Sequence, residues 1–345
     1  VGVAAALCKR HACEPNVVAR DHAFELQQTL LRQDASMPGV INADKDDLAR
    51  NAKVTSSSDA PLIFPESENF HAAVLPLGQL FPVSTNRLDS VELLLHSKAA
   101  TAKTVKLSLW KARSVWDLRP TQILTTAKAI VQPGQRGYIS FPLNLQTNPG
   151  SLYFIQIDTD PEIAWSLHTD KAGTPTLVPV GTTPADNPGG SMWRPLTKGR
   201  SFAMRITPEQ RPYTARNLVT GTNRPDLWTN IFKSDPKQEL PAWIELNWEK
   251  PVHLNQVQIT FDTGLNQRTT LPTFRNPDCV KSYSIAVLQS GGWKTVVEEK
   301  DNYARRRVHR IEPATANKVR ITVHETNGAA QARIYEVRIY NEERV

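Results

Sequence analysis

Cysteine is scarce in this chain, which has three, Cys8, Cys13 and Cys279, among 345 residues. Cys8 and Cys13 lie five apart in a stretch of helical pattern, so their side chains point to different faces, and Cys279 stands alone. The count excludes a small scaffold held by disulfides, and we expect all three to be thiols. Long apolar runs are also missing, because no segment approaches the roughly 20 residues that cross a bilayer. The sequence therefore predicts no membrane span.

Several sequence signatures of catalysis are absent as well. There is no G-x-G-x-x-G, H-E-x-x-H, C-x-x-C or G-x-S-x-G, so no complete dinucleotide fold, zinc site or serine-hydrolase elbow is indicated. Close acid pairs such as Asp158 with Asp160 come from single strand ends, whereas the paired carboxylates of glycosidases come from different elements. We predict no catalytic residue and no transition-metal site in this chain.

The balance of charge is positive, with 41 Lys and Arg against 34 Asp and Glu and a formal net charge of +7. The one dense basic cluster comprises Arg305, Arg306, Arg307 and Arg310, in a segment that alternates as a strand. Elsewhere basic residues are interleaved with acids. A solvated strand face accounts for this pattern, so we expect no nucleic-acid partner.

The first 39 residues have a helical pattern. Gly2 and residues 4–6, all alanine, favour a helix that begins very close to another group. An apolar stripe over residues 23–30 has helical spacing and stops at Pro38. A helix N-terminus presents free N–H groups and a positive dipole end, which suits the phosphates or carbonyls of a cofactor. Close packing of this helix on another helix is the alternative.

Beyond residues 40–68, a polar stretch that we expect to be a linker, the period of the apolar residues changes to two. Alternating runs bounded by Pro, Gly and Asn turns fill 69–210 and again 211–345. Without helices between the strands, this pattern predicts a mainly β chain: a short helical segment, 1–39, followed by two antiparallel β-sandwiches. The alternating residues expected in the two cores are Val91, Leu93, Leu95, Val105, Leu107, Leu109, Ile139, Phe141, Leu143, Tyr153, Ile155, Ile157, Phe202, Met204, Ile206, Ile244, Leu246, Trp248, Val257, Ile259, Phe261, Tyr283, Ile285, Val287, Val319, Ile321, Val323, Tyr335, Val337 and Ile339.

The start of the chain, VGVAAALCKRHACEPNVVARDHAFELQQTLLRQD, resembles the C-terminal end of FAD-dependent oxidoreductases with a glutathione-reductase-like flavin fold. The resemblance implies that the helix beginning at Gly2 meets the flavin end of FAD, mostly through the backbone of Val1, Gly2 and Val3. The family's dinucleotide fingerprint is absent. We therefore expect the chain to be a fragment, whose FAD site an N-terminal FAD-domain chain or a longer parent would complete.

A second resemblance covers about residues 217–343, which contain AWIELNWEKPVHLNQVQITFD, YSIAVLQSGGWKTV, RRVHRI and KVRITVHETNGAAQARIYEVRIY in that order. These segments resemble the discoidin, or coagulation-factor type C, module of the galactose-binding-like fold. The resemblance implies that the second sandwich is a jelly roll that binds carbohydrate or a related polyhydroxylated ligand. It also implies a structural Ca²⁺ held through carbonyls and carboxylates, and export to the periplasm or outside the cell.

Candidate ligand contacts are aromatic rings and polar side chains on loops. Trp243 and Trp248 are either sugar platforms or packing residues of one strand, and Trp228, in the loop-like segment TNRPDLWTN, is the better exposed ring. Asp262 and Arg275 flank a long connection, where they would either bind vicinal hydroxyls or form a salt bridge that orders the loop. The residues predicted to contact carbohydrate are Trp228, Asp262, Asn266, Arg268, Arg275, Asn302 and Arg305.

Two functions follow from these features. The first is the C-terminal part of an FAD-dependent oxidoreductase that acts on a polyhydroxylated compound, with sandwiches that bind or position the substrate. Its chemistry would belong to the flavin and to residues outside this chain, so the chain alone lacks the catalytic half. The alternative is a non-catalytic carbohydrate-binding or cell-surface adhesion protein.

Overall fold

The computed structural model describes residues 46–112, 122–169, 180–182, 194–195, 200–221, 223, 231–263 and 275–342. In these ranges the chain is mainly β, with several antiparallel sheets and two short 3₁₀ helices, η2 (Leu48–Asn51) and η3 (Ala215–Val219). No helix within them is long and apolar enough to span a bilayer. The predicted helical segment 1–39 lies outside the described residues.

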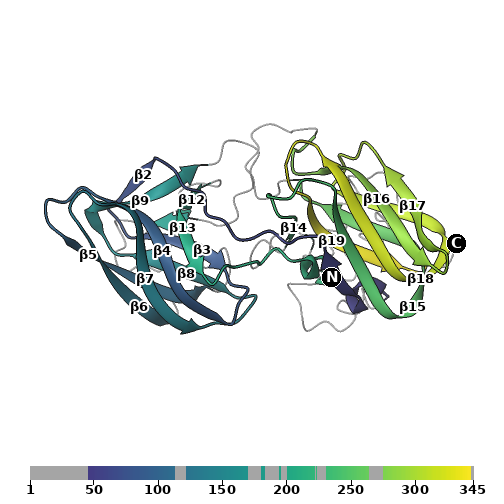
Figure 1. Cartoon of the computed structure of the whole chain (residues 1–345), viewed down its shortest axis with the longest axis horizontal. Helices are drawn as coiled ribbons and strands as arrows, with labels where there is room; N and C mark the ends of the chain where they lie inside the picture. Colours follow the sequence, from purple (N-terminus) through teal and green to yellow (C-terminus); the bar gives the residue numbers. More distant parts are fainter. Residues whose placement is uncertain are drawn as a thin grey trace, which may run out of the picture.

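The first sandwich consists of two six-stranded sheets (Figure 1). One sheet has the order β11-β10-β3-β8-β5-β6; in the other, β12, β9, β4 and β13 are neighbours, with β2 paired to β9 and β7 paired to β4. The strands are β2 (Phe70–Ala73), β3 (Leu77–Pro82), β4 (Arg87–Ser97), β5 (Lys103–Ala112), β6 (Ile123–Val131), β7 (Arg136–Gln146), β8 (Leu152–Ile157), β9 (Asp160–Thr169), β10 (Val180–Thr182), β11 (Arg194–Pro195), β12 (Arg200–Phe202) and β13 (Met204–Thr207).

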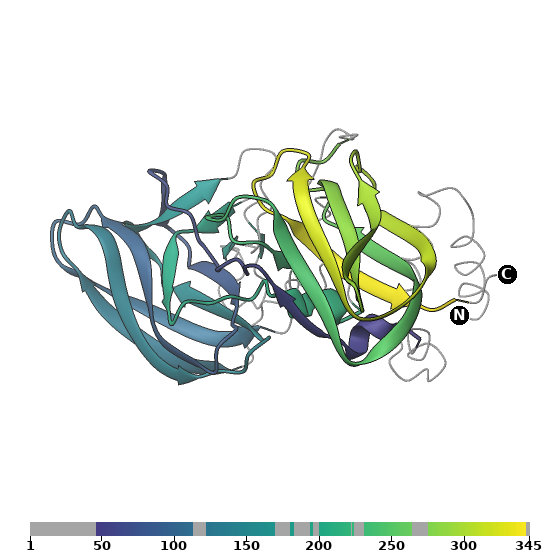
Figure 2. The same ribbon diagram turned by 45° about the vertical axis from the view of Figure 1, so that its right-hand side comes forward.

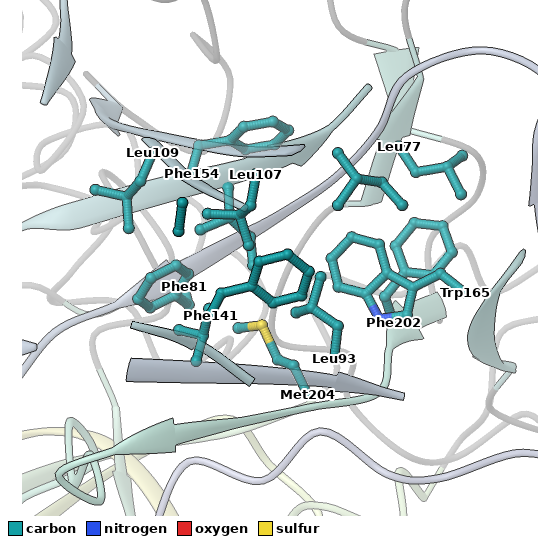
Figure 3. Close-up of a cluster of buried hydrophobic side chains, with 14 of the residues drawn as sticks. Leu77, Phe81, Leu93, Leu107, Leu109, Phe141, Phe154, Trp165, Phe202 and Met204 are labelled. Atoms are coloured by element: carbon teal, nitrogen blue, oxygen red, sulfur yellow. The ribbon is translucent and has the colours of Figure 1, made fainter. Parts of the chain in front are cut away.

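The core of this sandwich is apolar and lies between the two sheets. Figure 3 shows Leu107 and Phe154 of one sheet facing Leu93, Phe141 and Met204 of the other. The buried Gln79 of β3 joins the sheets, because its amide oxygen accepts a hydrogen bond from Phe202 N at 2.8 Å. The predicted alternating residues of this region are buried, apart from the half-buried Ile206.

The second sandwich is a single seven-stranded sheet that folds over on itself. Its two longest strands, β15 (Ala242–Phe261) and β18 (Arg306–Thr326), pair antiparallel along most of their length, with register shifts after Asn247 and after Leu254. The remaining strands are β1 (Lys53–Ser56), β14 (Phe232–Lys233), β16 (Val280–Gln289), β17 (Gly292–Glu299) and β19 (Arg333–Tyr340).

The long strands contribute to both layers of this second sandwich. The first half of β15 pairs with β1 and with the second half of β18, and β16 and β17 extend that layer. The second half of β15 pairs with the first half of β18 and with β19, which forms the other layer together with β14. Every predicted alternating residue from Ile244 to Ile339 is buried, as the mainly β prediction requires.

Part of the expected linker 40–68 belongs to the second sandwich instead. Strand β1 pairs with residues Ile244 to Asn247 of β15. Just before it, Asp47 caps η2 by accepting a hydrogen bond from Ala49 N, and it also accepts one from Ile339 N, both at 3.0 Å. Sequence pattern missed this strand because four residues are too few to show a period. The first sandwich is thus inserted between β1 and the rest of the second.

Two antiparallel segments cross between the sandwiches (Figures 1 and 2). They meet at the bridge between Ala60 and Tyr213, and Leu62 N donates to Gln210 O at 2.7 Å. The Lys233 ammonium lies 4.5 Å from the centre of the Tyr213 ring, which is buried. The connection is therefore packed and hydrogen-bonded, unlike a flexible linker.

Candidate functional site

Three connections of the second sandwich meet at one end of it. They follow β15, β17 and β18, and the strands that begin after them, β16, β18 and β19, pair beside those ends. Asn327 ties the connections together, because its side-chain amide donates to Cys279 O at 3.1 Å and to Asn302 O at 3.0 Å. The strands hold the described parts of these connections in place, which is the usual arrangement for a binding site.

Arg275, Asp301 and Tyr303 form the exposed part of this end, which we call the loop-end site. Arg275 Nη1 and Nη2 donate to the two carboxylate oxygens of Asp301 at 2.6 and 2.8 Å. The guanidinium carbon lies 5.7 Å from the centre of the Tyr303 ring. Arg275 and Asp301 are 42% and 58% exposed in their side chains and Tyr303 is 46% exposed, so all three are accessible from solvent.

The ion pair is charged over the whole neutral range. The hydrogen bond from Arg275 lowers the pKa of the Asp301 carboxyl, and the same bond raises the pKa of Arg275. A bidentate pair of this kind has a fixed geometry, while the carboxylate keeps lone pairs for further donors. The loop-end site therefore presents the Tyr303 ring beside the Asp301 carboxylate, an acceptor, and the Arg275 guanidinium, a donor, and the ion pair fixes the positions of both groups.

A buried ionic cluster lies beneath these loops. Arg333 Nη1 is 2.7 Å from Asp278 Oδ1 and 3.9 Å from Asp262 Oδ2, and all three side chains are at most 5% exposed. Nearby, the buried Arg305 donates to the main-chain carbonyl of Asn223 and lies 5.9 Å from the centre of the Tyr335 ring. These contacts fix the ends of β15, β18 and β19 relative to one another.

The structure separates the predicted ligand residues into three groups. Arg275 is exposed at the loop-end site, where it forms a salt bridge with Asp301 of another connection, while Asp262 faces Arg333. Asp262, Asn302 and Arg305 lie at the same end but in the interior, where burial keeps them from direct contact with a ligand. Asn302 Nδ2 donates to Val280 O at 2.7 Å, and its Oδ1 accepts from Ala304 N at 3.1 Å, which is a loop-ordering role. The predicted contacts that lie outside the described residues are Trp228, Asn266, Arg268, Val1, Gly2 and Val3.

Sequence reasoning missed Asp301 and Tyr303. A signal was present, because the segment DNYA interrupts the alternation between Glu299 and Arg306 and places an aromatic residue in a polar turn. The two candidate tryptophans of β15 lie in different environments. Trp248 is buried and its Nε1 donates to Leu48 O at 2.8 Å, whereas Trp243 is half-buried on the outer face of the sheet.

The described residues supply no obvious set of metal ligands. No group of three or more His, Cys, Asp or Glu within them is placed to hold an ion, and the carboxylates of Asp262 and Asp278 face the charge of Arg333. Burial raises the pKa of the Cys279 thiol to about 12, so it is not a thiolate ligand at neutral pH. The predicted structural Ca²⁺ remains a prediction.

No protein-family model and no curated protein matches this chain. Among solved structures, the family 32 carbohydrate-binding module from Streptococcus pneumoniae EndoD is 19% identical, over 38% of this chain and 87% of that chain, with a TM-score of 0.32. The family 32 module of C. perfringens NanJ in complex with galactose is 19% identical, over 39% and 90% of the two chains, with a TM-score of 0.30. The structure of SpGH29 is 18% identical over 39% of this chain, which spans only 25% of that chain, with a TM-score of 0.30. Because these TM-scores lie below 0.5, the similarities assign neither a fold nor a ligand to this chain.

Proposed function

We propose that this chain is a carbohydrate-binding protein and that the loop-end site of its second sandwich holds the sugar. The observation that carries the proposal is the exposed Tyr303 ring beside the bidentate pair of Arg275 and Asp301. An aromatic ring covers the apolar face of a pyranose, while charged groups form strong hydrogen bonds with its hydroxyls. The Asp301 carboxylate would accept from hydroxyls, and the Arg275 guanidinium would donate to them.

The arrangement around the site favours binding by preorganisation. Arg275 and Asp301 restrain each other, so less side-chain entropy is lost when a ligand arrives. The loops beneath are held by the ionic cluster of Arg333 with Asp278 and by the hydrogen bonds of Asn327. Because the site has only three side chains and would contact a single sugar, we expect a modest affinity for the ligand.

The flavin interpretation stays a prediction from the sequence. Its residues, Val1, Gly2 and Val3, lie outside the described part of the chain, so nothing in the structure bears on FAD. The carbohydrate-binding alternative is the better supported function, because it rests on described side chains. A polysaccharide ligand agrees with the predicted location in the periplasm or outside the cell.

The test is glycan binding by the whole chain, first on an array of neutral oligosaccharides and then by calorimetry with the best ligand. Tyr303→Ala should weaken binding about tenfold, and Arg275→Gln about fivefold, since each removes one contact. Ile130→Ala is the matched control, because it removes an exposed apolar side chain, 62% exposed, from the first sandwich. Unchanged affinity in both loop-end variants would overturn the site, and no binding to any glycan would overturn the function.

A further inference from the structure

A second group of aromatic and basic side chains lies on strands, on the outer face of the layer formed by β1, β15, β18, β16 and β17. The Arg320 guanidinium carbon is 5.3 Å from the centre of the Trp243 ring and 4.3 Å from that of Trp293. Trp243 comes from β15, Arg320 from β18 and Trp293 from the edge strand β17. We call these three residues the sheet-face site.

Strand register explains how the three side chains meet. Arg320 is paired with Glu245 on one side and with Ala286 on the other, and Ala286 is paired with Thr295 of β17. Paired residues share a face of the sheet. Ala286 is the smallest side chain in this row, so it leaves room above β16 for the indole of Trp293 to reach the guanidinium.

The basic side chains around this site outnumber the acids. Glu245 accepts hydrogen bonds from Nε and Nη2 of Arg320, with 2.8 Å for the Nε bond. In the adjacent row, Asn247 is paired with Lys53 on β1 and with Lys318 on β18. Lys53 is exposed, whereas Lys318 is half-buried and its Nζ lies 4.0 Å from Glu245 Oε2. Glu298 lies on the same face, because it is paired with Ser284 in the row of Trp243 and Thr322. Arg320, Lys318 and Lys53 therefore face two carboxylates, Glu245 and Glu298, and the balance is positive by one.

Cation–π contacts also stabilise sheets, but two features go beyond that role. Trp293 is 39% exposed and neither it nor Trp243 belongs to the hydrophobic core of the second sandwich. Within the described residues, moreover, Nη1 of Arg320 and the indole N–H groups of both tryptophans donate to no acceptor. These three donors are therefore available to a ligand that brings its own acceptors.

We propose that the sheet-face site binds an acidic polysaccharide, a chain of pyranoses that carry carboxylates. The two indoles would cover apolar sugar faces, and Arg320 Nη1 with Lys318 and Lys53 would receive the carboxylates. Charge complementarity selects this occupant over a neutral glycan. The proposal concerns a different surface from the loop-end site, and either one can fail without the other.

The test compares two ligands with the same backbone, a hexasaccharide of β-1,4-linked mannuronate and β-1,4-mannohexaose, by calorimetry on the whole chain. The mannuronate should bind more tightly, and raising the salt from about 0.05 to about 0.5 M should weaken its binding. Trp293→Ala should lose about fivefold in mannuronate affinity, and Lys318→Gln should lose less and reduce the salt dependence. Lys128→Gln, which removes an exposed lysine from the first sandwich, should bind mannuronate as the parent does.

Three results would overturn the sheet-face site. The first is an affinity for mannohexaose that equals that for mannuronate and falls equally in Trp293→Ala. The second is a Trp293→Ala variant, folded by circular dichroism, that binds mannuronate as the parent does. The third is an oligothymidylate of equal length that binds as tightly, because the surface would then take any polyanion. A loss of mannuronate binding in Tyr303→Ala would instead move that ligand to the loop-end site, which also contradicts the proposal.

Discussion

The two sandwiches bury different kinds of polar group. In the described part of the first, the buried polar residues are uncharged, namely Gln79, Ser97, Ser108, Thr147, Ser166 and Ser201. The second sandwich, in contrast, has charged residues among its buried ones: Asp47, Lys233, Glu245, Asp262, Asp278, Arg305, Arg306, Arg333, Glu336 and Arg338. The sandwiches have similar apolar cores, so the contrast does not come from a lack of hydrophobic residues.

Buried charges are costly, because each ion loses several kcal/mol of hydration that a partner must compensate. A fold that needed only stability would replace them with apolar residues, as the first sandwich does. In the second, Arg333 with Asp262 and Asp278 lies directly beneath the loops that carry Arg275 and Asp301. The contrast agrees with the proposal that the ligand binds at the second sandwich.

The largest expected effect comes from separating the sandwiches. A fragment of residues 211–345 lacks β1 and the cap residue Asp47, so the edge of β15 at residues 244–247 loses its partner and Ile339 N loses its acceptor. We expect this fragment to be largely unfolded by circular dichroism and NMR. Residues 61–210, which include Phe64 of the first core, should fold on their own.

The matched control for the fragment is the chain of residues 46–345, which keeps β1 and should unfold cooperatively. A fragment of residues 211–345 with dispersed NMR signals and the same melting temperature as the longer chain would contradict the role given to β1.

The second-largest expected effect comes from removing one of the buried charges. Arg333→Met removes a cation that faces the buried carboxylates of Asp278 and Asp262, and should destabilise the second sandwich by about 3 to 5 kcal/mol. Urea unfolding measures the change. Adding Asp278→Asn to Arg333→Met should restore part of the loss, whereas additive losses in the double variant would show that the two residues do not interact.

Much of this architecture follows from the sequence. Apolar and polar residues alternate clearly along strands that have one buried face. That alternation alone predicts core positions for residues such as Leu93, Ile155 and Ile321, and all three are buried. The mainly β fold is thereby confirmed. The pairing of strands could not be predicted in the same way, because it depends on contacts such as that of Val54 with Leu246, which are distant in the chain.

The loop-end site was predictable only in outline. The described residues that the sequence selected, Asp262, Arg275, Asn302 and Arg305, all lie at this end. The sequence did not show which of these side chains are exposed and which are buried, because loop residues do not alternate regularly between buried and exposed positions. Tyr303 was missed for the same reason.

A third prediction concerns the first sandwich alone. A Cβ on Gly78 would lie 2.3 Å from two ring carbons of the buried Phe154 and 2.9 Å from Ile155 O. Gly78→Ala should therefore destabilise this sandwich by about 1 to 3 kcal/mol, because neither a packed ring nor a backbone carbonyl can move freely. Thermal unfolding should show the loss, and Gly137→Ala, where nothing lies within 4 Å, is the control. Equal melting temperatures for the two variants would contradict the packing around Phe154.

The smallest effect is a pH dependence confined to the second sandwich. Burial lowers the pKa of His309, whose Nε2 is 2.7 Å from the Tyr283 hydroxyl, to about 4, and burial raises that of Asp47 to about 6. A lowered histidine pKa gives stability that is present above the ordinary value of 6.5 and is lost as the pH falls toward 4, whereas Asp47 acts in the opposite direction.

Comparing the parent with His309→Gln isolates the histidine, because Asp47 is common to both. Between pH 7 and pH 5 the parent should lose about 2 kcal/mol of unfolding free energy relative to the variant, since its unfolded state gains a proton that its folded state does not. Urea unfolding at the two pH values measures this difference. Parallel pH profiles for the two proteins would mean that His309 titrates normally in the folded state, and that its burial among Tyr283 and Arg307 does not exclude the charged form.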